Sequence, residues 1–313
     1  MKQIPLTLGG SDTYLTLGAG NFAVTTVGSG DTIYAGPGNI SINSLGNHNI
    51  FQITATARNT VTISMHGASD TAIVSGAGSG NIMSSGPNAT IAVSGGVNTI
   101  QAGGQGDTII SSDGTAFITA NNDYDQFAVL GTSGQTQLIT ANGYNDKFGL
   151  NSVSGFVQAA GGHDYIGVFG GTPVVNATGW HDEINIESSK TTLLESTFDT
   201  NHVDGNTLGT VISESGIYDV TFLTGNASAT IKLGPAADQV NIFGIGGGYA
   251  GITELIGLGA NIIDLHQITG LGTYAQVQAA ITHAPGGWKL PTPGGGEVLF
   301  MGEKPTAANF AFT

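Results

Sequence analysis

Five aspartates recur at nearly regular spacing in the middle of this 313-residue chain. The intervals between them are 18, 21, 18 and 18 residues, and a short apolar stretch follows each one: Asp107, Asp125, Asp146, Asp164 and Asp182. Carboxylates stacked about 4.8 Å apart repel each other by about 0.9 kcal/mol in water and by about 3.5 kcal/mol at an effective dielectric constant of 20. An exposed column therefore survives without metal, whereas a partly buried column needs cations. The alternative is that these aspartates are present only as turn formers.

The aspartates belong to a longer repeat. From Asp12 to Asp182, a turn residue followed by four or five residues of β-branched and aromatic alternation recurs every 8 to 11 positions, which predicts short strands joined by turns. Strands this short cannot bury a face alone, so we expect an all-β fold, a parallel β-helix or β-roll solenoid. Each coil then has two strands and two turns, with aspartate on one side only. About 13 coils would make a rod near 60 Å long, and a β-sandwich is the alternative.

The repeat changes along the chain, and three segments are predicted. Residues 1–190 form regular solenoid repeats, residues 191–260 form irregular coils with longer turns, and residues 261–313 form a small C-terminal α+β cap. The cap combines a strand at Ile262–Leu265 with the one clear helix at about Thr273–Thr282, whose apolar stripe has helical spacing. A strand pair around Trp288–Leu290 and Glu297–Met301 follows, joined by a glycine-rich link.

Composition excludes several classes of partner. The net charge is -15, from 22 acidic and 7 basic residues, so nucleic acid and anionic membranes are not expected partners. No stretch reaches the roughly 18 apolar residues of a membrane helix, so membrane insertion is not expected. The first residues contain no apolar segment of a Sec-type signal peptide. The absence of cysteine is compatible with export.

The motifs around the aspartates resemble a known repeat family. ANGYNDKF (141–148), AAGGHDYI (159–166) and ANNDYDQF (120–127) are similar to the hemolysin-type calcium-binding nonapeptide (RTX) repeats of bacterial proteins secreted by type I systems, although most opening glycines are lost. The resemblance implies that Asp107, Asp125, Asp146, Asp164 and Asp182 bind Ca²⁺ together with turn carbonyls. The order of elements in the last 50 residues resembles that family's C-terminal segment, which implies an uncleaved secretion signal and an extracellular or cell-surface location.

No catalytic set is visible, so we expect a protein that is not an enzyme. The single arginine, Arg58, has no carboxylate nearby in the sequence, and a polysaccharide lyase or epimerase built on it is the residual alternative. His163 and His181 lie one coil apart and could stack, but no third ligand type accompanies them. Two further features are compatible with binding, a set of threonines after the turns and aromatic residues near turns. The threonines are Thr13, Thr32, Thr60, Thr71, Thr90, Thr99 and Thr108, and the aromatic residues are Tyr124, Tyr144, Tyr165 and Trp180.

These features together predict a secreted structural protein. The repeat starts within the first residues of the sequence, so we expect the first coil to leave an open strand edge. Such an edge favours head-to-tail or lateral association with further copies of the chain. We therefore expect assembly into a surface layer, filament or extracellular matrix, assisted by Ca²⁺. The alternative is an extracellular solenoid module that binds a neutral polysaccharide or ice.

Overall fold

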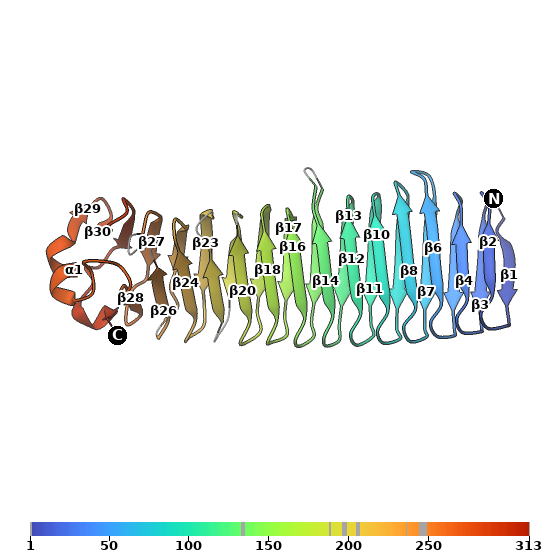
Figure 1. The fold of residues 1–313 in the computed structure, drawn as a ribbon, viewed down its shortest axis with the longest axis horizontal. Coiled ribbons are helices and arrows are strands. Elements are labelled where there is room, and N and C mark those ends of the chain that lie inside the picture. Colours follow the sequence, from blue (N-terminus) through green and yellow to red (C-terminus); the bar gives the residue numbers. More distant parts are fainter. Residues whose placement is uncertain are drawn as a thin grey trace. The chain divides into compact units, whose positions relative to one another are not determined.

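The computed structural model describes residues 2–132, 135–187, 189–195, 199–204, 207–235, 237–243 and 249–312. The chain is a parallel β-solenoid of about 13 turns with a small C-terminal helix and strands, which confirms the predicted fold class (Figure 1). It divides into two compact units, Met1–Gln158 and Ala159–Thr313. The predicted boundaries at residues 190 and 260 stay predictions.

The first unit consists of two parallel sheets whose strands alternate along the chain. Sheet A contains the odd-numbered strands, which pair in sequence from β1 to β15. Its strands, with β17 at the end of the unit, are β1 (Ile4–Leu8), β3 (Phe22–Thr26), β5 (Ile40–Ser44), β7 (Thr60–Met65), β9 (Ser79–Ser84), β11 (Val97–Ala102), β13 (Thr115–Ala120), β15 (Gln137–Ala141) and β17 (Ser154–Ala159).

Sheet B of the first unit contains the even-numbered strands, which pair from β2 to β16. They are β2 (Tyr14–Leu17), β4 (Thr32–Ala35), β6 (Ile50–Ala55), β8 (Thr71–Gly76), β10 (Thr90–Ser94), β12 (Thr108–Ser112), β14 (Gln126–Leu130) and β16 (Lys147–Asn151). One strand from each sheet and two turns make one coil, as the repeat predicted.

The core of the first unit lies between its sheets, in columns of equivalent side chains. Alternate residues of each strand point inward, and because the strands are parallel and in register, the same position of every coil falls in the same column. The column in sheet A is Val24, Ile42, Ile63, Ile82, Ile100, Ile118 and Ile139, all buried. The column in sheet B is Ile33, Phe51, Ala72, Ile91, Ile109, Phe127 and Phe148. Burial of each large side chain contributes about 1.5–3 kcal/mol.

The second unit, described by itself, also has two parallel sheets whose strands alternate along the chain. Its sheet A strands are β19 (Thr172–Ala177), β21 (Thr192–Glu195), β23 (Leu208–Glu214), β25 (Ser228–Lys232) and β27 (Ile252–Ile256). Its sheet B strands are β18 (Tyr165–Phe169), β20 (Glu183–Glu187), β22 (Thr200–Val203), β24 (Val220–Thr224), β26 (Gln239–Phe243) and β28 (Ile262–Asp264).

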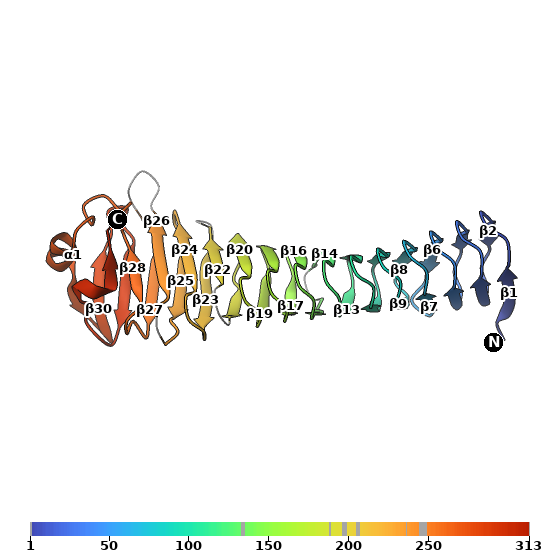
Figure 2. The same cartoon turned by 90° about the horizontal axis from the view of Figure 1, so that it is seen from below.

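The last residues close the end of the second unit (Figure 2). Helix α1 (Tyr274–Ala280) starts at Thr273, whose hydroxyl accepts a hydrogen bond from the backbone N–H of Gln276, and it buries Val277. Strand β30 (Gly287–Pro291) pairs antiparallel with both β29 (Thr282–Ala284) and β31 (Glu297–Met301), and β31 pairs parallel with β27 in sheet A. After the short helix η1 (Ala307–Asn309), β32 (Phe310–Ala311) pairs with β28. The predicted helix and strand pair are confirmed within one or two residues.

The one α-helix in the described part of the chain has seven residues. Among the described residues, no helix is long and apolar enough to cross a membrane.

Candidate functional site: a buried aspartate ladder

The predicted aspartates occupy one equivalent position, directly before each sheet B strand. There the side-chain oxygen Oδ1 accepts a hydrogen bond from the backbone N–H of the equivalent residue one coil earlier, and we call this series the aspartate ladder. In the first unit its acceptors are Asp31, Asn49, Asp70, Asp107, Asp125 and Asp146, with N···O distances of 2.8–2.9 Å. In the second unit they are Asp182, Asp199, Asp219, Asp238 and Asn261, at 3.0–3.3 Å, and Asp164 supplies the first N–H.

The ladder lies inside the coil. All five predicted aspartates are 0–1% exposed. The turn that directs them inward contains a left-handed residue just before the ladder position, as at His48 (φ 55°), Tyr124 (φ 65°) and His163 (φ 59°). The sequence pattern placed Asp12 in the repeat series with these aspartates, and this alignment is wrong. Asp12 is itself a left-handed residue (φ 56°), and Thr13 occupies the ladder position, because aspartate suits both places in such a turn.

The two asparagines of the ladder show what surrounds the second terminal atom of the side chain, which is Nδ2 in asparagine and Oδ2 in aspartate. Asn49 Nδ2 donates to the carbonyl of Gly28 in the preceding coil, at 3.3 Å, and to Ser44 Oγ at 2.9 Å. Asn261 Nδ2 likewise donates to the carbonyl of Gly234, at 3.1 Å. An ionised aspartate presents an acceptor instead of a donor at this atom. It therefore requires a turn N–H, a proton or a cation.

Some aspartates obtain such a donor and others do not. Asp107 Oδ2 accepts from the backbone N–H of Gly104 at 3.2 Å, and Asp70 Oδ2 accepts from Ser44 Oγ at 2.8 Å. The Oδ2 atoms of Asp125 and Asp182 are buried without a hydrogen-bond partner. A buried carboxylate oxygen in this state favours protonation or an added cation.

Burial changes the ionisation of the ladder. It raises the pKa of Asp107, Asp146 and Asp182 from 3.8 to about 6. The pKa of Asp125 rises to about 8, first because of burial and then because Asp146 and Asp107 place negative charge on either side of it. At neutral pH the middle of this run therefore holds a proton unless a cation replaces it.

The chemistry of the ladder fits a hard cation in part. The aspartate rungs supply carboxylate oxygens, and the contacts of Asn49 and Asn261 show that turn carbonyls lie within reach of this side-chain position; both are donor types that Ca²⁺ prefers. Within the described residues, however, no three His, Cys, Asp or Glu side chains come together as a metal site. Ca²⁺ held by Asp107, Asp125, Asp146, Asp164 and Asp182 would thus depend on backbone carbonyls for most of its ligands, and it stays a prediction.

Sequence reasoning missed the part of the ladder in the irregular coils. Asp199, Asp219 and Asp238 continue it at intervals of 17, 20 and 19 residues after Asp182. Each directly precedes a strand, and that local signal could have identified them. The longer, variable turns concealed the interval.

Sequence reasoning also missed a buried acid outside the ladder. Glu214 is 4% exposed, and its Oε1 accepts a hydrogen bond from Thr221 Oγ1 at 2.9 Å. Burial raises its pKa well above the ordinary value, and the charges of Asp238 and Asp219 raise it further. The alternation of side chains along β23 could have predicted its burial, because Glu214 lies four residues after the buried Thr210 and therefore points to the same inward side.

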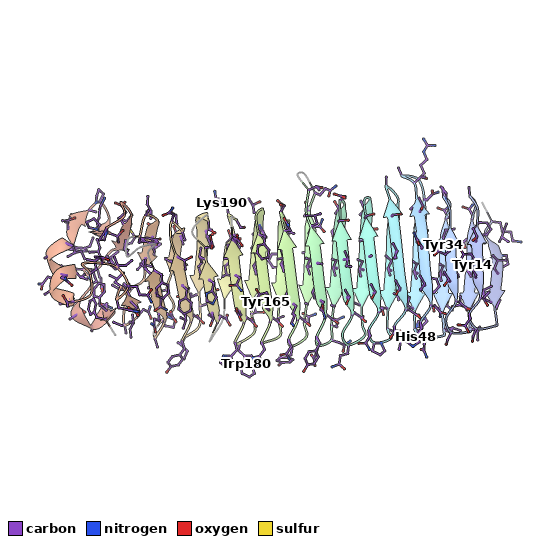
Figure 3. The ribbon with its side chains drawn as sticks, in the orientation of Figure 1. Tyr14, Tyr34, His48, Tyr165, Trp180 and Lys190 are labelled. Atoms are coloured by element: carbon purple, nitrogen blue, oxygen red, sulfur yellow. The ribbon has the colours of Figure 1, made fainter. Side chains whose placement is uncertain are left out.

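The predicted histidine pair lies at the surface of the turns. The rings of His163 and His181 stack with centroids 5.3 Å apart, as expected from their spacing. Trp180 lies against both, with ring centroids 4.9 Å from His163 and 5.0 Å from His181, and is 46% exposed. Figure 3 shows Trp180 projecting from the turns. Tyr124 and Tyr144 are also exposed turn residues, whereas Tyr165 points outward from strand β18.

The remaining candidates lie apart from one another. Arg58 is exposed in the turn between β6 and β7. The threonines divide between the sheets: Thr60 and Thr99 belong to sheet A, and Thr13 precedes β2. In sheet B, Thr71, Thr90 and Thr108 form three consecutive rungs, but Ile50 separates them from Thr32.

Comparisons with protein families, with curated protein sequences and with solved structures find no match to this chain. The resemblance to calcium-binding nonapeptide repeats therefore stays a prediction, with which the solenoid is compatible.

Proposed function

We propose that the protein is a secreted structural solenoid that assembles, through its exposed strand edges and faces, into a surface layer, filament or extracellular matrix. The observation that carries this proposal is the first coil. Strands β1 and β2 pair only with β3 and β4 among the described residues, and Tyr14 is 68% exposed. The inward Leu6 and Leu15 are only half-buried, because no rung among the described residues lies beyond them.

The two edges of this first coil differ. In a parallel strand, alternate residues direct their backbone groups to opposite neighbours. The backbone N–H of Ile4 donates to the carbonyl of Asn21, and the carbonyl of Leu8 accepts from the N–H of Val27, so Ile4 and Leu8 face β3. Pro5 therefore faces the free edge of β1, where it provides no N–H. In β2, Thr13 and Leu17 face β4, so Tyr14 and Thr16 direct their N–H groups to the free edge. Sheet B thus presents the more complete edge for another strand.

The outward faces support lateral contacts. Sheet A of the first unit places Thr99, Phe117 and Leu138 in one outward column, and Phe117 and Leu138 are exposed. A surface with uncharged and apolar side chains lacks the like-charge repulsion that would keep copies apart.

Ca²⁺ has a specific place in this proposal. Ionised carboxylates of the ladder are destabilising inside the core, and a bound cation offsets that cost. Ca²⁺ therefore stabilises the coils at the pH at which the ladder ionises, and assembly follows from coils that stay closed.

Electron microscopy of the purified protein at pH 8, with Ca²⁺ or with EDTA, tests the proposal. We expect ordered assemblies with Ca²⁺ and fewer with EDTA. Thr16→Pro removes one N–H from the free edge of β2 and should reduce assembly, whereas Pro5→Ala restores an N–H to the edge of β1 and should not. Monodisperse particles under both conditions would contradict the proposal.

A further inference from the structure

The outward face of sheet B in the second unit carries a stack of rings. His202 on β22 and Phe222 on β24 stack nearly parallel, with centroids 4.9 Å apart and an angle of 7° between the rings. Phe243 on β26 stacks on Phe222 at 5.8 Å. Because Phe222 covers one face of the imidazole, the other face of His202 lies toward β20.

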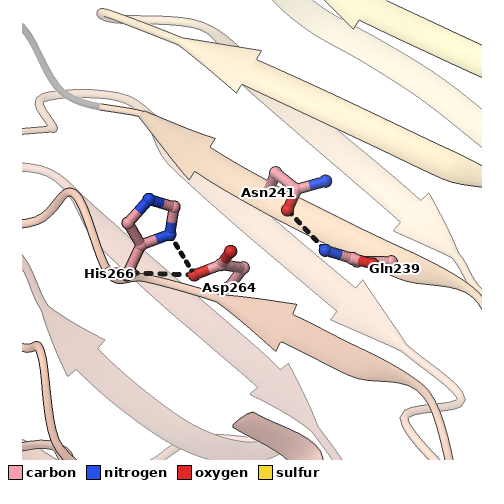
Figure 4. A network of polar contacts seen from close by, with 4 residues as sticks. All are labelled: Gln239, Asn241, Asp264 and His266. Atoms are coloured by element: carbon pink, nitrogen blue, oxygen red, sulfur yellow. Dashed lines mark hydrogen bonds and ion pairs between the residues drawn. The ribbon is translucent and has the colours of Figure 1, made fainter. Parts of the chain in front are cut away.

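The stack ends differently at its two ends. Beyond Phe243, the polar groups satisfy one another: Gln239 Nε2 donates to Asn241 Oδ1, and His266 Nδ1 contacts Asp264 Oδ1, both at 2.7 Å (Figure 4). The ring of Phe243 meets His266 edge-on at 6.4 Å. At the end toward β20, Asn185 lies next to His202, and its Nδ2 donates to Glu183 Oε1 at 3.3 Å.

A hollow of about 390 Å³ lies at that open end. The strand register places Asn185 next to His202, and Gly167 next to Asn185. Gly167 itself is buried, and the rings of Tyr165 and Phe169 stand on either side of it on the outward face. Those two rings are 41% and 43% exposed. The hollow is lined by Tyr165, Phe169, Asn185, Glu187, His202, Asp204 and Thr224, among others.

The lining fits one ligand chemistry. Ring faces pack on the C–H face of a pyranose, while amide, hydroxyl and carboxylate side chains hydrogen-bond to its hydroxyl groups. The hollow extends over the four rungs from β18 to β24, on the order of 14 Å, which suits a short extended chain of sugars. Glu187 and Asp204 at the hollow, in a chain of net charge -15, disfavour a polyanion.

We propose that this hollow is a binding site for a neutral polysaccharide, in which one pyranose packs against the open face of His202 and the next units lie over Asn185 toward Tyr165 and Phe169. This inference does not depend on assembly, since all its residues belong to one unit.

Calorimetric titration with neutral oligosaccharides tests the site: cellohexaose, laminarihexaose, xylohexaose and chitin hexamer, with oligogalacturonate and deacetylated chitosan hexamer as charged comparisons. We expect at least one neutral oligomer to bind. His202→Ala should weaken that binding at least tenfold. Asn185→Ala should also weaken it by removing an amide that lines the hollow, and the substitution leaves the inward Ile184 and Ile186 of β20 unchanged.

Asn151→Ala is the matched control, because Asn151 is an exposed asparagine that points outward from β16 in sheet B of the first unit. It should leave binding unchanged. Chemical-shift mapping on the wild-type protein should place the changes on β18–β24. Binding by charged oligomers alone, by no oligomer, or equally by the wild-type, His202→Ala and Asn185→Ala proteins would overturn the proposal.

Discussion

Replacing Asp125 by asparagine should stabilise the protein at neutral pH. The amide keeps an Oδ1 acceptor for the N–H of Asp107, and it removes the carboxylate oxygen that is buried without a hydrogen-bond partner. The ladder asparagines show that a side-chain amide fits this position, since Asn49 donates to the preceding coil. The substitution therefore tests the charge with little change of shape.

The magnitude follows from the pKa of Asp125. In the folded protein it is about 8, and the ordinary value is 3.8. A raised pKa of an acid means that the folded state holds a proton that the unfolded state releases. The stability that Asp125 contributes is therefore fully present below about pH 4 and is lost as the pH rises toward 8. The ordinary pKa of 3.8 lies about three units below pH 7, so keeping Asp125 protonated in the folded protein at pH 7 costs about 4 kcal/mol of stability. Because the amide must also be desolvated, we expect a gain of about 2–4 kcal/mol.

Urea unfolding followed by circular dichroism in EDTA, at pH 4.5 and pH 7, measures this effect. Asp125→Asn should gain stability at pH 7 and lie within about 1 kcal/mol of wild type at pH 4.5. The control is Asp113→Asn, at an exposed left-handed position that asparagine also tolerates. Added Ca²⁺ should stabilise wild type more at pH 7 than at pH 4.5. Equal stability of Asp125→Asn and wild type at both pH values would refute this reasoning.

Three further substitutions test the turns by the same unfolding assay. Asn49→Asp replaces the donor to Gly28 by an acceptor and should cost about 2–3 kcal/mol at pH 7 but less at pH 4.5; a loss independent of pH would argue against a charge effect. Gly38→Ala brings a Cβ onto the carbonyl oxygen of Gly20 and should cost about 3 kcal/mol; wild-type stability would show that these turns are not packed as described. Ala237→Gly relieves a left-handed alanine (φ 66°) and should add about 1 kcal/mol; a loss would contradict this turn conformation.

The solenoid could be predicted because burial requires periodicity. Short strands with alternating apolar residues bury their inward side only by stacking, so columns such as Ile42 and Ile63 leave a regular trace in the sequence. The C-terminal cap could be predicted because apolar residues at helical spacing occur only once, after the series of short strands. The spacing also identified which aspartates are equivalent.

The orientation of the ladder could not be predicted in the same way. Spacing shows that Asp107 and Asp125 occupy the same place in successive coils, but a carboxylate at a turn can point outward or inward. The choice depends on the left-handed residue before it, and Asp, Asn, His, Tyr and Ser all fill that place. The hollow beside His202 was hidden for another reason: coil lengths vary in the second unit, so strand register alone brings Gly167, Asn185 and His202 together.

Site-resolved ¹³C-NMR titration of the aspartate carboxyl carbons, in EDTA, tests the central claim about the ladder most directly. The account predicts that Asp125 titrates near pH 8 and that Asp107, Asp146 and Asp182 titrate near pH 6, with all four moving to lower pH when Ca²⁺ is added. Titration of all four below pH 5 without Ca²⁺ would contradict it, because carboxyl groups that ionise so easily do not lie in the core.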